Sequence, residues 1–255
     1  MGQMTLQSST EFLSVAGMVL QGALAVVLLG RKAWKRYPLF TGYALFSFVG
    51  GIMLYLVRHH RMVFLYSYWI EETIAIGLGF AVVYEVFKTL FSTHQALLKL
   101  AGLIFRWTAV ALLCLGVVVI LVQLPSAASL SKAAWFSKAA FVLEEATRVV
   151  EVGLLMFLFG ASAAFGLHWK QAEFGIALGL GLYVAVQLAT ITLRSQLGLQ
   201  AWQLMDVVSI LAFDTSLLVW LGYLLAPERV TSAGEVPKRA QLEQWNQAVM
   251  ELISR

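Results

Sequence analysis

One apolar stretch of the sequence carries four charged residues at helical spacing. In the segment LEEATRVVEVGLL, Glu144 and Arg148 lie four residues apart, and Arg148 lies three residues from both Glu145 and Glu151. On a helix these side chains fall near one face and can form ion pairs along it. Because charged groups in long apolar helices rarely face lipid, the same cluster could instead line a ligand or ion site. A structural salt-bridge network and a binding site both remain open.

Two later apolar stretches add further polar groups. In residues 174–193 and just beyond, Tyr183, Gln187, Thr190 and Arg194 follow one another at steps of four, three and four residues, which places them on a single helical stripe. We expect this stripe to face protein or water, and we expect Arg194 to meet an acidic partner from a neighbouring helix. The last stretch contributes two acidic residues, Asp206 near its start and Asp214 near its middle. For Asp214, a hydrogen-bonded carboxyl group and a proton-relay role are both open.

A third stretch, 67–88, holds acidic residues near both of its ends. Glu71 and Glu72 stand at its beginning, where solvated side chains at the helix end are the expected arrangement. Glu85 lies three residues before Lys88, and this spacing predicts a local ion pair. We expect no metal site at the adjacent pair His59 and His60, because neighbouring residues point about 100° apart on a helix.

The elements that must position these residues are membrane-spanning helices. Hydrophobic residues make up 60% of the 255 residues and charged residues only 13%, and the mean hydropathy is +0.80. A soluble domain carries about 25% charged residues, and a spanning helix needs roughly 20 mainly apolar ones. The sequence therefore predicts an all-α, polytopic membrane protein with a seven-transmembrane-helix bundle. We place the spans at residues 12–30, 38–57, 67–88, 103–124, 140–165, 174–193 and 205–226.

Charge distribution predicts the orientation of this bundle. With the N-terminus outside, 12 Lys and Arg residues fall on the inner side and five on the outer side, and Arg148 lies within a span. The positive-inside rule then favours an outer N-terminus and a cytoplasmic C-terminus. In this orientation most of the acidic residues within the spans lie in the outer half, which indicates a polar pocket open to the outside. The basic pI of 9.2 follows from topology, so we expect no nucleic-acid partner.

The chain divides into a transmembrane domain, residues 1–226, and a cytoplasmic tail, residues 227–255. The tail has apolar residues at helical spacing, which predicts a short amphipathic helix. Such a helix lies on the bilayer, docks on its own bundle or binds a cytoplasmic or membrane protein partner. The apolar residues are Leu242, Trp245, Val249, Leu252 and Ile253.

Comparison with known families argues against a retinal protein and against a CAAX-type protease. The last span has no lysine for a retinal Schiff base, and Glu144, Glu145 and Arg148 are one residue short of the Glu-Glu-x-x-x-Arg motif of CAAX-type intramembrane proteases. The segments YSYWIEETIAIGLGFAVVYEVF (66–87) and GLLMFLFGASAAFGLHWKQAEFGIALGLGLYVAVQL (153–188) are similar to those of an uncharacterised group of bacterial seven-helix membrane proteins. That resemblance implies the topology and a location in the bacterial inner membrane, and it implies no activity.

These observations favour a sensor or ligand-binding membrane component, with the arginines binding an anion or pairing with the carboxylates. The alternative is a proton- or ion-coupled transporter with Glu151 and Asp214 as carriers, and an intramembrane enzyme is a third hypothesis. We expect the lipid bilayer as the surrounding partner and no cofactor or metal, and the oligomeric state stays open. The residues expected to form the site are Glu144, Arg148, Glu151, Gln187, Thr190, Arg194 and Asp214.

Overall fold

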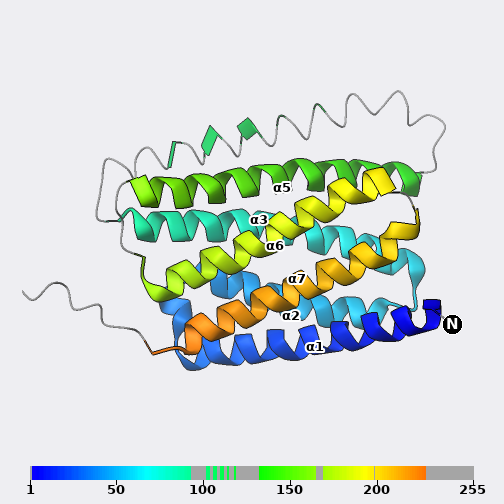
Figure 1. The fold of residues 1–255 in the computed structure, drawn as a ribbon, viewed down its shortest axis with the longest axis horizontal. Helices are drawn as coiled ribbons and strands as arrows, with labels where there is room; N and C mark the ends of the chain where they lie inside the picture. The colour runs from blue at the N-terminus through cyan, green and yellow to red at the C-terminus, as the bar shows by residue number, and fades with distance from the viewer. Residues whose placement is uncertain are drawn as a thin grey trace, which may run out of the picture. The chain divides into compact units, whose positions relative to one another are not determined.

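The protein is built from long helices. A computed structural model describes the backbone of residues 2–92, 132–164, 169–197 and 199–227, together with eight residues between 102 and 118. Within these residues the regular elements are six α-helices of 20 to 33 residues and one 3-10 turn (Figure 1). They are α1 (Gly2–Gly30), η1 (Ala33–Lys35), α2 (Pro38–Val57), α3 (Arg61–Leu90), α5 (Lys132–Ala164), α6 (Gln171–Leu197) and α7 (Leu199–Leu225).

All six α-helices are long and apolar enough to cross a membrane. They contain six of the seven predicted spans, with ends within one residue of the helices or inside them. The remaining span, 103–124, lies mostly outside the described residues, and its few described residues are helical. The chain is therefore all-α and has the composition of a multi-pass helical membrane bundle.

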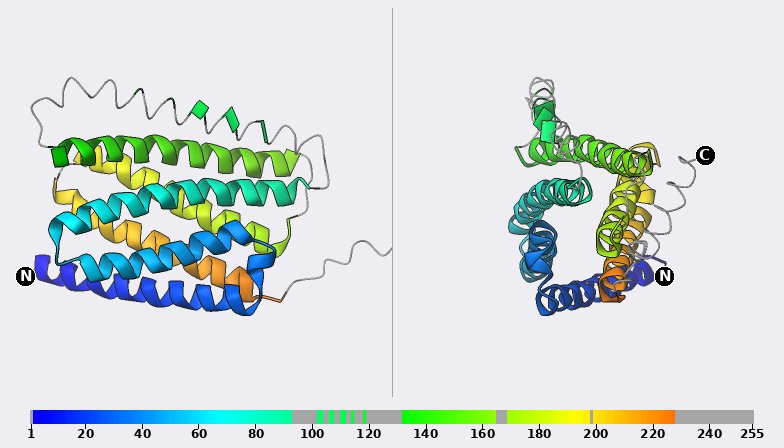
Figure 2. Two further views of the ribbon diagram at one scale, coloured as in Figure 1. Left: turned by 180° about the vertical axis from the view of Figure 1, so that it is seen from behind. Right: turned by 90° about the vertical axis from the view of Figure 1, so that its left-hand side faces the viewer.

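Contacts join the six helices into a closed ring in the unit Met1–Leu225. Each helix packs against the next in the order α1, α2, α3, α5, α6 and α7, and α7 packs back against α1. The end-on view in Figure 2 shows α2 and α3 on one side, α6 and α7 on the other, and α1 and α5 closing the two remaining sides. A ring of this kind leaves an interior that side chains from every helix can reach.

The ring consists of two three-helix halves with the same order. Short connections make α2 antiparallel to α1 and α3, and α6 antiparallel to α5 and α7. The halves α1–α3 and α5–α7 therefore occupy corresponding places, with α3 beside α5 and α7 beside α1. The sequence showed no internal repeat, because the correspondence lies in helix order and direction and not in residue identity.

Aromatic packing fills one end of the ring, which we call the core end. It comprises the C-terminal halves of the odd-numbered helices and the N-terminal halves of α2 and α6. Trp220 is 1% exposed, contacts Phe40 edge-to-face at 5.2 Å between ring centroids, and donates a hydrogen bond from Nε1 to the Ile176 carbonyl. Its indole lies against Gly179 so closely that a Cβ there would be 2.3 Å from Nε1, and Gly175 admits Tyr223 in the same way. This glycine pair at four-residue spacing lets α6 and α7 approach closely.

Two charged side chains fix helix ends at the core end. The Glu85 carboxylate of α3 accepts hydrogen bonds from the Leu39 and Phe40 amides, at 3.0 and 2.8 Å, at the N-terminus of α2. The expected pair with Lys88 was therefore wrong, because the unpaired amides of a helix start attract a carboxylate more specifically than a flexible lysine does. Where α1 packs against α7, Arg31 donates hydrogen bonds to the last two carbonyl groups of α7.

Candidate functional site

A large cavity occupies the opposite end of the ring, which we call the cavity end. Its volume is about 1290 Å³, and all six described spanning helices contribute residues to its wall. The lining runs from Gly79 and Leu180, next to the core, to Arg58 and Asp206 at the helix ends. The cavity is therefore closed toward the core end and extends to the helix termini at the cavity end.

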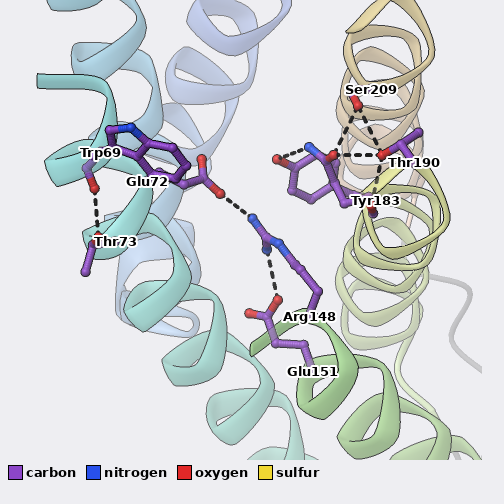
Figure 3. Close-up of polar contacts among 9 residues, drawn as sticks. Trp69, Glu72, Thr73, Arg148, Glu151, Tyr183, Thr190 and Ser209 are labelled. Atoms are coloured by element: carbon purple, nitrogen blue, oxygen red, sulfur yellow. Dashed lines mark hydrogen bonds and ion pairs between the residues drawn. The ribbon is translucent and has the colours of Figure 1, made fainter. Parts of the chain in front are cut away.

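Arg148 is the most connected charged group in the cavity wall. Its two terminal nitrogens bind different carboxylates: Nη1 lies 2.9 Å from Oε2 of Glu151 on the same helix, and Nη2 lies 2.5 Å from Oε1 of Glu72 on α3. The guanidinium group also lies 5.4 Å from the ring centroid of Tyr183 on α6. Figure 3 shows this side chain reaching from α5 between its two carboxylates. Arg148 thus joins three helices of the ring.

The side chains that form the Arg148 ion pairs are almost completely buried. The Arg148 and Glu151 side chains are 5% and 0% exposed, and that of Glu72 is 13% exposed. Guanidinium groups pair well with carboxylates through several donors, and such pairs hold the geometry of the groups around them. Arg148 Nε and Glu151 Oε1 nevertheless have no hydrogen-bond partner among the described residues. The network is therefore not fully satisfied within the protein.

Two of the buried carboxylates rest against glycines of a neighbouring helix. A Cβ at Gly79 of α3 would lie 2.6 Å from Oε1 of Glu151, and a Cβ at Gly17 of α1 would lie 2.6 Å from Oδ1 of Asp214. Side-chain atoms essentially never come so close, so an alanine at either position would require the carboxylate to shift. These contacts lie at the α3–α5 and α1–α7 seams, which correspond in the two halves of the ring.

A neutral polar network lines the wall formed by α6 and α7. The Gln187 side chain donates to the Tyr183 hydroxyl at 2.9 Å and accepts from the Ser209 hydroxyl at 3.1 Å. Thr190 donates to the Gln187 carbonyl and lies 3.4 Å from the Ser209 hydroxyl (Figure 3). The polar stripe predicted on α6 therefore faces protein and cavity, as expected for polar groups on an apolar helix.

An ion pair stands at the rim of the cavity. Arg194 Nη2 lies 2.5 Å from Asp206 Oδ1, and the Asp206 side chain is 56% exposed. This confirms the expected acidic partner of Arg194, which comes from α7. Both arginines named as site residues thus pair with carboxylates, which is one of the two roles considered for them.

Three carboxylates of the wall have no such partner. Glu71, Glu144 and Asp214 line the cavity and make no ion pair or hydrogen bond among the contacts of the described residues. Glu144 and Asp214 are each 8% exposed, and Asp214 Oδ1 is completely buried. A carboxylate buried without a partner is costly unless a proton or a cation neutralises it. These three groups are the wall carboxylates that have no salt bridge among the described residues.

The structure brings together most of the residues that the sequence singled out. Glu144, Arg148, Glu151, Gln187, Arg194 and Asp214 all line the cavity. Thr190 is not among the lining residues and acts through its contact with Gln187.

Glu72 is the main residue that sequence reasoning placed wrongly. We expected a solvated helix end, but α3 begins at Arg61 and not near residue 67, so Glu72 lies about 16 Å along the helix. The close contacts at Gly17 and Gly79 were also not predicted, because they depend on which helix faces each glycine, and the sequence does not indicate that.

Comparisons with known proteins add no identity. No protein-family model, no curated protein and no solved structure matches the chain. In the described residues, no group of three or more His, Cys, Asp or Glu side chains is arranged to hold a metal ion. What the site can do must therefore be argued from its geometry.

Proposed function

We propose that the chain is a seven-span protein of a bacterial inner membrane, with its N-terminus outside and its C-terminus in the cytoplasm. Six described helices of spanning length support the bundle, and the apolar run 103–124 supplies the remaining span. The excess of Lys and Arg on one side supports the orientation. In this orientation the cavity end faces outward.

We further propose that the protein is a sensor or ligand-binding component that takes a solute into the cavity. The observation that carries this proposal is the pair of carboxylates, Glu144 and Asp214, that stand in the cavity wall without a salt bridge or hydrogen bond among the described residues. A purely structural network would pair such groups, as Arg148 is paired. A sensor of this kind would pass its signal to a separate protein through residues 228–255, which lie outside the described residues.

Thiol labelling tests whether the cavity is an accessible aqueous site. Cys114 is replaced by Ser, and single cysteines are introduced as Ala75→Cys, in the cavity wall, and Ile74→Cys, which is 44% exposed on the outer surface of the ring. A charged, membrane-impermeant methanethiosulfonate added to intact cells or oriented vesicles should label Ala75→Cys from the outside. Ile74→Cys should remain unlabelled, because a lipid-facing thiol does not form the reactive thiolate.

Two other labelling results would contradict the orientation and the ligand-binding proposal separately. Labelling of Ala75→Cys from the cytoplasmic side alone would overturn the orientation. Equal protection of the two adjacent cysteines from both sides would overturn the ligand-binding proposal itself, because it would mean that no water-filled cavity exists between the helices.

A proton- or ion-coupled transporter is the second candidate, and the paired halves of the ring favour it. Parallel three-helix repeats about an axis normal to the membrane occur in transporters, where the substrate lies between the halves. Glu151 and Asp214, at corresponding seams, would then carry the coupling ion. Proton- or solute-driven flux in proteoliposomes that survives the joint change Glu151→Gln and Asp214→Asn would refute this assignment.

A further inference from the structure

We propose that the ligand of the cavity is an organic cation with an aromatic or bulky apolar body. The proposal rests on the ligand-binding function proposed above and names the class of ligand. Three properties of the wall carry it: its charge balance, its aromatic surface and its size.

The charge balance of the wall is acidic. Six carboxylates and three guanidinium groups line the cavity. Arg148 and Arg194 are engaged by carboxylates, and Arg58, at the helix end, lies 4.2 Å above the ring of Tyr55. The carboxylates of the wall therefore outnumber the guanidinium groups, and Glu144 and Asp214 are buried carboxylates that make no direct salt bridge among the described residues.

Asp214 supplies an observation independent of the acidic cluster. It stands on α7, at the seam with α1 and away from the Arg148 network of α3 and α5, and it is more than nine-tenths buried. Its Oδ1 has no hydrogen-bond partner within the described part of the chain. A group so placed gains free energy from any ligand that brings a positive charge to it.

Aromatic side chains make up much of the remaining wall. Tyr68 and Trp69 contact each other edge-to-face at 5.3 Å between ring centroids, and Tyr183 and Phe213 do so at 5.2 Å. Aromatic faces attract cations, and the pairing of Arg148 with the Tyr183 ring shows that this cavity already holds a cation in that way. An aromatic cation would use both the carboxylates and the rings.

The size of the cavity decides between inorganic and organic cations. A cavity of about 1290 Å³ exceeds the ordinary range for drug-sized ligands, which is about 300–1,000 Å³. Among the described residues no cluster brings together three His, Cys, Asp or Glu side chains to replace the hydration shell of a bare metal ion. The apolar surface of the cavity wall favours binding of a ligand with a large hydrophobic body.

Binding of tetraphenylphosphonium tests the proposal, with tetraphenylborate as a probe of the same shape and opposite charge. Both are measured by equilibrium dialysis against the full chain in phosphatidylcholine nanodiscs, with empty nanodiscs subtracted. We expect saturable binding of the cation and at least about tenfold weaker binding of the anion. Equal affinity for the two ions, or no saturable binding of the cation, would overturn the proposal without any mutation.

A matched pair of variants locates the cation. Glu144→Gln should weaken tetraphenylphosphonium binding about tenfold, and Asp214→Asn should do the same. Glu145→Gln is the control, because Glu145 neighbours Glu144 on α5 but does not line the cavity. Cation affinity that is unchanged in both site variants, or reduced equally by the control, would refute the assignment of the carboxylates. If Asp214→Asn does not accumulate, Glu144→Gln and the charge-retaining Glu144→Asp decide the result.

The experiment separates this inference from the proposed function. If Ala75→Cys is labelled but the chain does not prefer the cation, the cavity is real and the ligand class is wrong. If Ala75→Cys is protected from both sides, the ligand-binding proposal fails, and the ligand class fails with it. Protection of Ala75→Cys from labelling by tetraphenylphosphonium, and not by tetraphenylborate, would support both.

Discussion

Removing the charge of Arg148 should destabilise the bundle strongly. Arg148→Met keeps most of the apolar stem but leaves Glu72 and Glu151 facing each other across the α3–α5 seam. The Glu151 side chain is completely buried and that of Glu72 is 13% exposed, so water in the cavity replaces the lost partner only in part. Breaking a buried ion pair on one side costs about 3–5 kcal/mol, which is a large part of the stability of an ordinary domain.

The free energy of unfolding can be measured by titrating the purified protein with dodecyl sulfate in mixed micelles. We expect the midpoint of Arg148→Met to fall sharply. The triple variant with Glu72→Gln and Glu151→Gln should recover most of the loss, because no unpaired charge remains. An Arg148→Met variant as stable as the native chain, or a triple variant that is less stable than the single one, would refute the reasoning that these three charges form one network.

Three further changes probe the seams, the helix ends and the rim by the same measurement. Gly79→Ala places a Cβ 2.6 Å from Glu151 Oε1 and should lower the free energy of unfolding by about 1–3 kcal/mol. Gly77→Ala is the control: its Cβ meets nothing within 4 Å, so stability should be unchanged or slightly higher. Equal effects of the two changes would contradict the packing of α3 against α5. Glu85→Gln weakens the acceptor at the start of α2 and should cost about 0.5–2 kcal/mol, with faster amide exchange in that first turn as the local readout. Asp206→Asn removes an exposed rim ion pair and should cost at most about 1 kcal/mol, so a loss as large as that of Arg148→Met would show that the rim is buried.

Local patterns predicted the helices well because spanning segments are defined by their own hydropathy. Each of the six described spans, and the polar stripe from Tyr183 to Arg194, follows from composition and helical period within one segment. The position of a residue along its helix follows in the same way. The exception, Glu72, arose from a boundary: α3 begins six residues before the predicted span.

Lateral arrangement could not be predicted because it depends on contacts between distant segments. Nothing in the sequence indicates that α3 lies beside α5, so the Glu72–Arg148 pair, 76 residues apart, was out of reach. The glycines that admit Glu151 and Asp214 are likewise recognisable only once the facing helix is known. A signal that could have been used is Gly175 with Gly179, whose spacing is typical of close helix packing in membranes.

The most direct test of the central claim is a nitroxide accessibility scan along α3. In a Cys114→Ser background, spin labels placed one at a time over residues 64–79 are exposed to a water-soluble nickel relaxant and to oxygen, which concentrates in lipid. The cavity predicts that nickel accessibility rises with helical period at Leu65, Tyr68, Glu72 and Ala75, four of the lining positions of α3, while oxygen accessibility rises on the opposite face. Oxygen maxima at the lining positions, or no accessibility of those positions to the nickel relaxant, would contradict a water-filled site inside the ring.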